Sequence, residues 1–295
     1  MSNNGIIQSF KLLLKSRIKI PFAFSWGTAV SGLIASRGFP EILPYIMTVV
    51  CSFMTSLCIY FYNDLIDAEF DKVNKVKGLR PVAQGTVTEN TAKTIVVILG
   101  VSSLGLSYLI NLNTMMYTAI FLVTGFVYSY PGIYLKQYLL MKETLAGSSP
   151  IFYGLIGMYG ATNTFTMDAF FFNILIAIFV FTLIPLIDQS DIEEDKMRGM
   201  NSLALNTSHQ TRIYVSIIGL VVVLLLTPLS YLYFNYSIIA PIFIWILGGQ
   251  LLRHLIPLAR DYESADLGKT WSSLFRFYIL SPLIFALSVY SIPFI

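Results

Sequence analysis

The 295-residue chain is 56% hydrophobic and 12% charged, with a formal net charge of +3 and a mean hydropathy of +0.71. A soluble domain carries about 25% charged residues, so this composition excludes a soluble globular protein and indicates an integral membrane protein. The small net charge gives no reason to expect a nucleic-acid partner.

Nine apolar runs are long enough to cross about 30 Å of hydrocarbon, which takes about 20 helical residues each. In chain order they cover about residues 18–36, 43–63, 92–110, 114–130, 145–161, 168–187, 212–233, 237–257 and 273–293. We therefore predict an all-α polytopic membrane protein, with nine transmembrane helices in a single bundle and one domain over residues 1–295. No small-residue cleavage site follows the first run, so we do not expect a removed signal peptide.

The lysines and arginines are distributed unevenly over the connections between these nine runs. Eighteen of the nineteen fall on one side of the predicted bundle, and Arg37 alone falls on the other. Because basic loops tend to stay in the cytoplasm, we expect a cell-membrane protein with its N-terminus and long loops in the cytoplasm and its C-terminus outside. Cys51 and Cys58 share one predicted helix and are interpreted as packing residues.

Two stretches with the same spacing of aspartates follow the second and sixth apolar runs. They are DLIDAEFD, with Asp64, Asp67 and Asp71, and DQSDIEED, with Asp188, Asp191 and Asp195. Positions i, i+3 and i+7 fall within about 60° of arc on a helix, so each stretch predicts one acidic face. Asn63 extends the first face by one turn. Both faces are expected at the same, cytoplasmic, membrane level, where clustered carboxylates repel one another and require a cation between them.

The chemistry of the donors indicates which cation. All-oxygen ligands without histidine or cysteine favour a hard ion, and Mg²⁺ typically takes one or two carboxylates together with substrate phosphates. The two faces therefore predict a site for a metal-bound diphosphate. One alternative is that each acidic face only solvates a helix end, and another is a non-enzymatic cation or lipid carrier. A cation pathway would require polar residues along the spans, whereas these acids gather at one end.

Both stretches also resemble motifs of a known family. NDLIDAEFD resembles the NDxxDxxxD motif, and DQSDIEEDKMRGMNSL the second aspartate motif, of the UbiA superfamily of intramembrane prenyltransferases. The resemblance covers essentially the whole chain and implies a Mg²⁺-dependent transferase of isoprenoid and lipid biosynthesis. Such an enzyme ionises a polyprenyl diphosphate and transfers the prenyl group to a lipophilic acceptor. It also implies nine transmembrane helices, with the motifs on the second and sixth.

The resemblance also implies roles for individual residues. Carried over by position, one metal ion is bound by Asn63, Asp67 and Asp71, and the other by Asp188, Asp191 and Asp195. Asp67 and Asp191 are the predicted catalytic members of the two motifs, and Asn63 is also predicted to bind substrate. Asp64 could face the exterior of its helix.

The loop after the first motif, DKVNKVKGLRPVAQG, carries Lys72, Lys75, Lys77 and Arg80 and keeps an Arg-Pro pair that is common in the family. We interpret it as a lid. Its Arg80 is a predicted catalytic residue that clamps phosphate through two hydrogen bonds, and Lys72 and Lys77 are predicted to bind substrate. The alternative for the lysines is an ordinary positive-inside loop.

A third stretch, YSYPGIYLKQ, resembles the family's element of a tyrosine followed by a lysine. The resemblance implies that Lys136 holds the diphosphate and acts in catalysis. It further implies that the ring of Tyr130, or of Tyr128, stabilises the allylic cation. The alternative is an interfacial aromatic belt with a lysine that extends toward water.

The acceptor is the least defined part of the prediction. The acid-rich second motif resembles archaeal digeranylgeranylglyceryl phosphate synthases, while quinone-ring acceptors remain open. A terpene cyclase on the same fold would ionise the same diphosphate without an acceptor. Membrane lipid is the remaining expected partner, and the sequence indicates neither a protein partner nor an oligomeric state.

Overall fold

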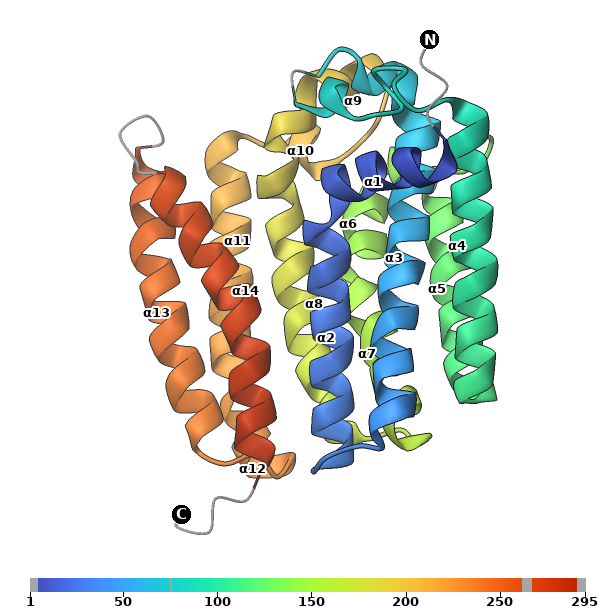
Figure 1. Ribbon diagram of the computed structural model, residues 1–295. Coiled ribbons are helices and arrows are strands. Elements are labelled where there is room, and N and C mark those ends of the chain that lie inside the picture. Colours follow the sequence, from blue (N-terminus) through green and yellow to red (C-terminus); the bar gives the residue numbers. More distant parts are fainter. Residues whose placement is uncertain (1–4, 75, 262–266, 291–295) are drawn as a thin grey trace.

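The structure is a computed structural model that describes residues 5–74, 76–261 and 267–290. Its long helices run side by side as a bundle (Figure 1). They are α2 (Lys19–Ser36), α3 (Ile42–Asp71), α4 (Glu89–Ile110), α5 (Leu112–Ser129), α7 (Ser149–Thr162), α8 (Met167–Ile187), α11 (His209–Leu226), α13 (Ile239–Arg260) and α14 (Leu267–Val289). The described residues contain no strand, so the predicted all-α class is confirmed.

The remaining elements are short. Five are α-helices: α1 (Ile6–Arg17), α6 (Met141–Gly147), α9 (Ile192–Met197), α10 (Leu203–Asn206) and α12 (Pro228–Tyr233). Three are 3-10 turns: η1 (Lys77–Leu79), η2 (Leu135–Gln137) and η3 (Asp188–Asp191). Most of them gather at one end of the bundle, together with the ends of α3 and α8 (Figure 1). We call this the charged end, because both aspartate motifs lie there.

Each of the nine predicted runs coincides with a helix, but not every helix is long enough to span a membrane alone. Seven segments are long and apolar enough within the described residues: α3, α4, α5, α8, α11 continued through α12, α13 and α14. α1 and α2 meet the criterion together, but they are bent by 74° at their junction. α7 has 14 residues, fewer than the about 20 that a span needs. The described residues thus provide seven or eight candidate spans, which confirms a polytopic membrane protein.

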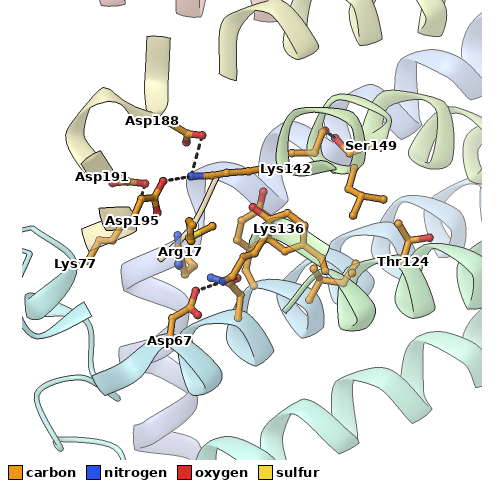
Figure 2. A pocket seen from close by; sticks show the side chains of 18 of the residues that line it. Arg17, Asp67, Lys77, Thr124, Lys136, Lys142, Ser149, Asp188, Asp191 and Asp195 are labelled. Atoms are coloured by element: carbon orange, nitrogen blue, oxygen red, sulfur yellow. Dashed lines mark hydrogen bonds and ion pairs between the residues drawn. The ribbon is translucent and has the colours of Figure 1, made fainter. Parts of the chain in front are cut away.

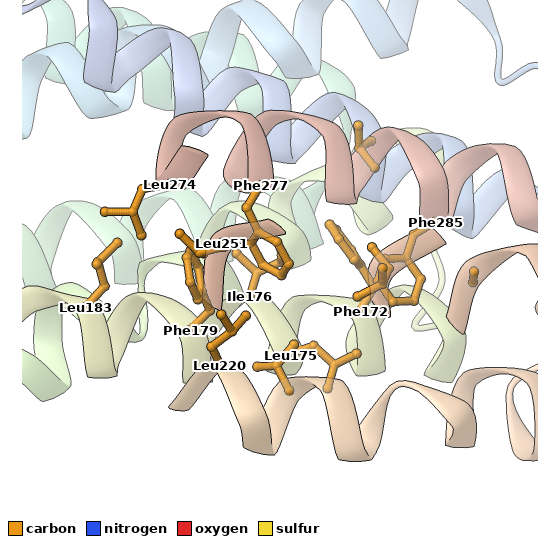
Figure 3. Close-up of a cluster of buried hydrophobic side chains, with 14 of the residues drawn as sticks. Phe172, Leu175, Ile176, Phe179, Leu183, Leu220, Leu251, Leu274, Phe277 and Phe285 are labelled. Carbon is orange, nitrogen blue, oxygen red and sulfur yellow. The ribbon is translucent and has the colours of Figure 1, made fainter. Parts of the chain in front are cut away.

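α8 is the central helix of the larger apolar core. It is hydrophobic on every face, as expected for a helix that is surrounded by others. Figure 3 shows its phenylalanines against α14, where the Phe179 and Phe277 ring centroids lie 4.8 Å apart and those of Phe172 and Phe285 lie 5.3 Å apart. A second cluster joins α3 to α4. α3 is therefore held by packing from the membrane region up to the charged end, where its motif begins.

Glycines let α7 approach α2 and α3 closely. A Cβ at Gly157 would overlap the carbonyl oxygen of Thr28 on α2, and one at Gly160 would overlap the side chain of Thr48 on α3. Small residues at such contacts allow helix backbones to pack directly against each other in a membrane. This glycine seam fixes α7 beside α2 and α3, below the charged end.

Candidate active site

A cavity of about 220 Å³ opens at the charged end, between the two aspartate motifs. Its polar wall is formed by Arg17, Asn63, Asp67, Lys77, Arg80, Lys136, Lys142, Asp188, Asp191, Glu194, Asp195 and Arg198. Its apolar wall is formed by Phe24, Ile59, Tyr60, Phe121, Gly125, Tyr128, Leu145 and Ala146. Because α3 and α5 both end here, residues one or two turns earlier on them lie deeper in the bundle. The cavity therefore has a charged mouth above an apolar floor.

The first motif occupies the last turns of α3, which continues without a break to Asp71. Asp64 is 1% exposed and accepts hydrogen bonds from Arg17, whose Nε lies 2.9 Å from Oδ2. Arg80 Nη1 lies 3.1 Å from Asp64 Oδ1 and donates to Asp71 Oδ2 at 2.6 Å. The possibility that Asp64 faces the helix exterior is thus wrong. The carboxylate points inward because two arginines from other segments neutralise it.

Asp67 is the carboxylate of this motif that lines the cavity. It accepts hydrogen bonds from Lys136 Nζ at 2.5 Å, from Arg198 Nη1 at 2.6 Å and from the Tyr134 hydroxyl at 3.2 Å. Asn63 Oδ1 accepts from the same Lys136 amine at 3.2 Å. Burial lowers the pKa of Lys136 to about 8 although Asp67 acts in the opposite direction. The amine therefore remains mostly protonated at neutral pH, as phosphate binding requires.

The second motif differs from the prediction of a regular helical face. α8 ends at Ile187, two residues after Pro185, and the motif continues as the 3-10 turn η3 and then as α9. Asp188 and Asp195 nevertheless converge on Lys142 of α6, whose Nζ lies 2.9 Å and 3.0 Å from their Oδ2 atoms (Figure 2). Burial raises the pKa of Asp188 to about 6, against the effect of Lys142. Burial is the largest single influence on the Lys142 amine and opposes its charge, but Asp188, Tyr128 and Asp195 together outweigh burial and raise the pKa of this amine.

The loop after α3 contributes two of its predicted residues to the cavity. Arg80 and Lys77 line it, and Lys77 Nζ lies 2.7 Å from Asp191 Oδ2. Lys72 is instead exposed over half of its side chain and pairs with Glu69 on the outer surface of the same helix end, at 2.6 Å. Lys75 lies outside the described residues. The loop thus connects the two motifs through Lys77 and Arg80.

The structure also distinguishes between the two candidate tyrosines. Tyr130 is 53% exposed, whereas Tyr128 lines the cavity and its ring centroid lies 5.4 Å from Lys136 Nζ. α5 ends at Ser129, so Tyr130 already lies outside the helix that faces the cavity. Three of the predicted site residues do not line the cavity as the structure describes it: Asp71, Lys72 and Tyr130.

Four charged residues of this wall were not assigned to the site from the sequence, although Arg17 was considered as either a phosphate contact or a basic anchor before the first apolar run. Lys142 lies in the same short loop as Lys136, and Arg198 and Glu194 lie in the segment that carries the second motif. Arg17 ends α1 at the bend into α2. Arg198 and Glu194 could have been found from their place in and beside the second motif, whereas Lys142 and Arg17 lie far from both motifs in the sequence and only the fold brings them to the cavity.

The carboxylates of the two motifs differ in how well they suit Mg²⁺. No group of three or more acidic, histidine or cysteine side chains in the described part of the chain is placed to hold a metal ion. Mg²⁺ needs only one or two carboxylates when phosphate oxygens complete its coordination. Asp188 and Asp195 fit this requirement, because these two carboxylates share a single positive charge, that of the Lys142 amine, which lies within hydrogen-bond distance of both. Asp67 and Asp71 fit it less well, because arginines already contact both of them.

Together, the bundle and its amphipathic cavity define an integral membrane protein with a site for a ligand that has an anionic head and an apolar tail. The model of the UbiA prenyltransferase family matches residues 24–291, and the chain belongs to this family. The resemblance seen in the motifs is thereby confirmed, and with it the prediction of a membrane enzyme that transfers prenyl groups.

Individual relatives agree with this assignment. The chain is 28% identical over 225 residues to a digeranylgeranylglyceryl phosphate synthase of Methanococcus aeolicus, a match that covers 73% of this chain and 75% of the relative. It is 24% identical over 259 residues to a 4-hydroxybenzoate octaprenyltransferase of Klebsiella pneumoniae, which covers 83% and 86%. Among solved structures, a UbiA homologue from Archaeoglobus fulgidus bound to DMAPP and Mg²⁺ has a TM-score of 0.71 at 15% identity, covering 96% of this chain and 99% of the other. At that identity the structural likeness establishes the fold.

Proposed function

We propose that this protein transfers an isoprenyl group from a polyprenyl diphosphate to a lipophilic acceptor, with Mg²⁺ at the diphosphate. The observation that carries the proposal is the division of the cavity into a charged mouth and an apolar floor. A prenyl diphosphate has the same division between head and tail. The A. fulgidus homologue supports the donor and the ion, because its structure contains DMAPP and Mg²⁺.

In this proposal the basic side chains of the mouth hold the diphosphate. Lys77, Arg80, Lys136 and Lys142 all line the cavity and carry ammonium or guanidinium groups that bind phosphate oxygens. Mg²⁺, held by Asp188 and Asp195 and by the predicted ligand Asp191, would neutralise charge that develops on the leaving diphosphate. Preorganised positive charge of this kind lowers the barrier to breaking the carbon–oxygen bond.

The floor has a different task. The ring of Tyr128 and the side chains of Phe24 and Phe121 surround the space where the first carbons of the prenyl group would lie. Phe24 and Phe121 are stacked with a centroid distance of 5.9 Å, and Phe24 also contacts the Tyr60 ring. Aromatic faces stabilise a neighbouring cation, and an apolar enclosure keeps water from capturing it. Both effects direct the allylic cation to the acceptor.

For the acceptor, we propose a glycerol phosphate ether lipid as the first candidate. The relatives named digeranylgeranylglyceryl phosphate synthases support this choice. The charged residues of the cavity wall support it too, because six basic side chains line the cavity beside five acidic ones. 4-Hydroxybenzoate is the competing candidate, which the K. pneumoniae relative supports.

We also propose the predicted topology. Nine helices, including α2 and α7, would cross the membrane as one domain over residues 1–295. The N-terminus and the charged end would be cytoplasmic and the C-terminus outside. The support is the distribution of eighteen of the nineteen basic residues on one side. Cysteine labelling in intact cells at each end would test it, since the charged end should react only after permeabilisation.

The function is tested with purified protein, Mg²⁺ and geranylgeranyl diphosphate, alone and with each acceptor. Diphosphate release and lipid products are followed by mass spectrometry. Release that depends on one acceptor and yields its prenylated product supports the proposal. Acceptor-independent release with a cyclic hydrocarbon would mean a cyclase instead, and no release with any donor length would refute the proposal. Asp191→Ala should abolish release, while Lys72→Ala, a control on the outer surface, should keep it.

A further inference from the structure

Arg198 lies where the resemblance would put a metal ion. Its Nη1 is 2.6 Å from Asp67 Oδ1, and its Nη2 is 3.6 Å from Asp71 Oδ1. One guanidinium therefore hydrogen-bonds Asp67 and forms a longer ion pair with Asp71, whose Oδ1 accepts no hydrogen bond within the described residues. It reaches them from the segment after α9, so it also joins the first motif to the second.

The surroundings of Arg198 hold this guanidinium in place. Nη2 forms an ion pair with Glu194 one turn earlier, and Nη1 donates to the Tyr134 hydroxyl at 2.8 Å. The Phe70 ring centroid lies 4.6 Å from Cζ, and the side chain is 3% exposed. Glu194 is itself anchored by Lys77 at 2.9 Å. An ion that displaced Arg198 would leave a buried guanidinium without its carboxylates, which is strongly unfavourable.

The two motifs differ in how their charges are balanced. Each aspartate of the first motif contacts two basic side chains: Asp64 contacts Arg17 and Arg80, Asp67 contacts Lys136 and Arg198, and Asp71 contacts Arg80 and Arg198. At the second motif, Asp188 and Asp195 share the single amine of Lys142, and Asp191 pairs with Lys77, so three aspartates contact two basic side chains. A divalent cation is repelled by fixed guanidinium groups and attracted where carboxylates outnumber cations.

Arg198 also has a hydrogen-bond donor to spare. Its Nε is buried and donates to no acceptor in the described part of the chain, although the residue lines the cavity. A buried N–H group without an acceptor is costly, so it indicates a partner that arrives with the ligand. A metal ion at this position would neutralise charge on a motif carboxylate and on the diphosphate. Arg198 has donors for both contacts.

We propose that the guanidinium of Arg198 replaces one metal ion at the first aspartate motif, and that this protein binds its catalytic metal at the second motif alone. The diphosphate is then held between one ion and one arginine. Glu194 acts as the positioning residue that orients this arginine. The inference rests on the proposed function in one respect, which is that the ligand is a prenyl diphosphate.

The test counts bound metal. Purified protein is saturated with a non-cleavable thio-analogue of geranylgeranyl diphosphate and titrated with Mn²⁺, and free Mn²⁺ is measured by electron paramagnetic resonance. We expect one ion per wild-type molecule. Asp188→Asn should lose it, Asp67→Asn should retain it, and Glu69→Gln, an exposed carboxylate on the same helix as Asp67, should retain it as a control. Arg198→Gln should bind a second ion, since it frees Asp67 and Asp71.

Two ions in the wild type, or loss of the ion in Asp67→Asn, would overturn the inference. If Arg198→Gln does not fold, the contrast between Asp67→Asn and Asp188→Asn still decides. Prenyl transfer is measured on the same wild-type preparation with the natural donor. Transfer with two bound ions would overturn the single-ion inference and leave the proposed function standing. Absence of transfer with every acceptor would count against the function itself.

Discussion

Lys142→Met should destabilise the protein and make its stability depend on Mg²⁺. The Lys142 amine lies 2.9 Å and 3.0 Å from two buried carboxylates, those of Asp188 and Asp195. Removing one member of a buried ion pair costs about 3–5 kcal/mol, because the remaining charge is left uncompensated. Methionine keeps an unbranched side chain that matches the lysine stem and removes the ammonium group. We therefore expect a loss of unfolding free energy in this range.

Mg²⁺ should restore part of this loss, because the ion can take the place of the amine between the two carboxylates. An ion at about 100 times its dissociation constant stabilises the folded state by about 2.7 kcal/mol. The assay is thermal unfolding of the purified protein in detergent, with and without Mg²⁺. The midpoint should rise with Mg²⁺ more in the variant than in the wild type.

The matched control is Lys72→Met, which removes a lysine from an exposed pair with Glu69. Exposed ion pairs contribute about 0–1 kcal/mol, so the midpoint should barely change. Equal midpoints for Lys142→Met and Lys72→Met, with no added effect of Mg²⁺ on the former, would refute the assignment of Lys142 as the cation between the second-motif carboxylates.

Three further predictions concern the cavity and the bundle. Arg80→Ala should raise the KM for the donor roughly 10- to 100-fold, because a charged hydrogen bond of about 1.5–3 kcal/mol is lost. A steady-state titration with the donor measures this KM, and an unchanged value would contradict the role of Arg80 in binding the diphosphate. Tyr128→Leu should lower kcat by up to roughly 30-fold, because a contact of about 2 kcal/mol between the cation and the aromatic ring is lost. Tyr130→Leu should keep kcat within about twofold of the wild type, and equal kcat values for the two variants would contradict the different roles of the two tyrosines. Gly157→Ala should lower the free energy of unfolding by about 1–3 kcal/mol, because the added Cβ overlaps the Thr28 carbonyl. Unchanged thermal stability would contradict the close contact between α7 and α2 at this glycine.

The architecture was largely predictable from the sequence. Hydrophobic length and the i, i+3, i+7 spacing depend only on helix geometry, so the helix positions and the meeting of both motifs at one end followed directly. The bend between α1 and α2 was not predicted, although Pro21, which has no N–H to donate to the carbonyl of Arg17, signals a helix break at this point. The shortness of α7 was hidden for another reason, since apolar residues of the neighbouring α6 extend the same hydropathy run.

The site was only partly predictable. Two residues near the cavity lysines adopt left-handed backbone conformations. Tyr134, with φ of 45°, lies just before Lys136, and Leu140, with φ of 67°, lies between Lys136 and Lys142. Such conformations are usually signalled by glycine or asparagine, and neither residue type occurs at these two positions. The turns that aim both lysines at the aspartates therefore depend on tertiary contacts. The ion pairs of Asp64 and of Arg198 were not predicted for the same reason, because their partners come from distant segments.

The glycine seam described above also bears on how the protein moves in a fluid bilayer. At Gly157 and Gly160, α7 lies directly against the Thr28 carbonyl of α2 and the small Thr48 side chain of α3, so no long side chain at these two contacts can change rotamer to let one helix slide past another. We expect these three helices to behave as one rigid body, with slow amide hydrogen exchange. α13 and α14 meet the rest of the bundle through large side chains such as Phe277 and Phe285, which tolerate small shifts. The opening motions that admit a lipid substrate should therefore be concentrated in these two helices and in the loops of the charged end.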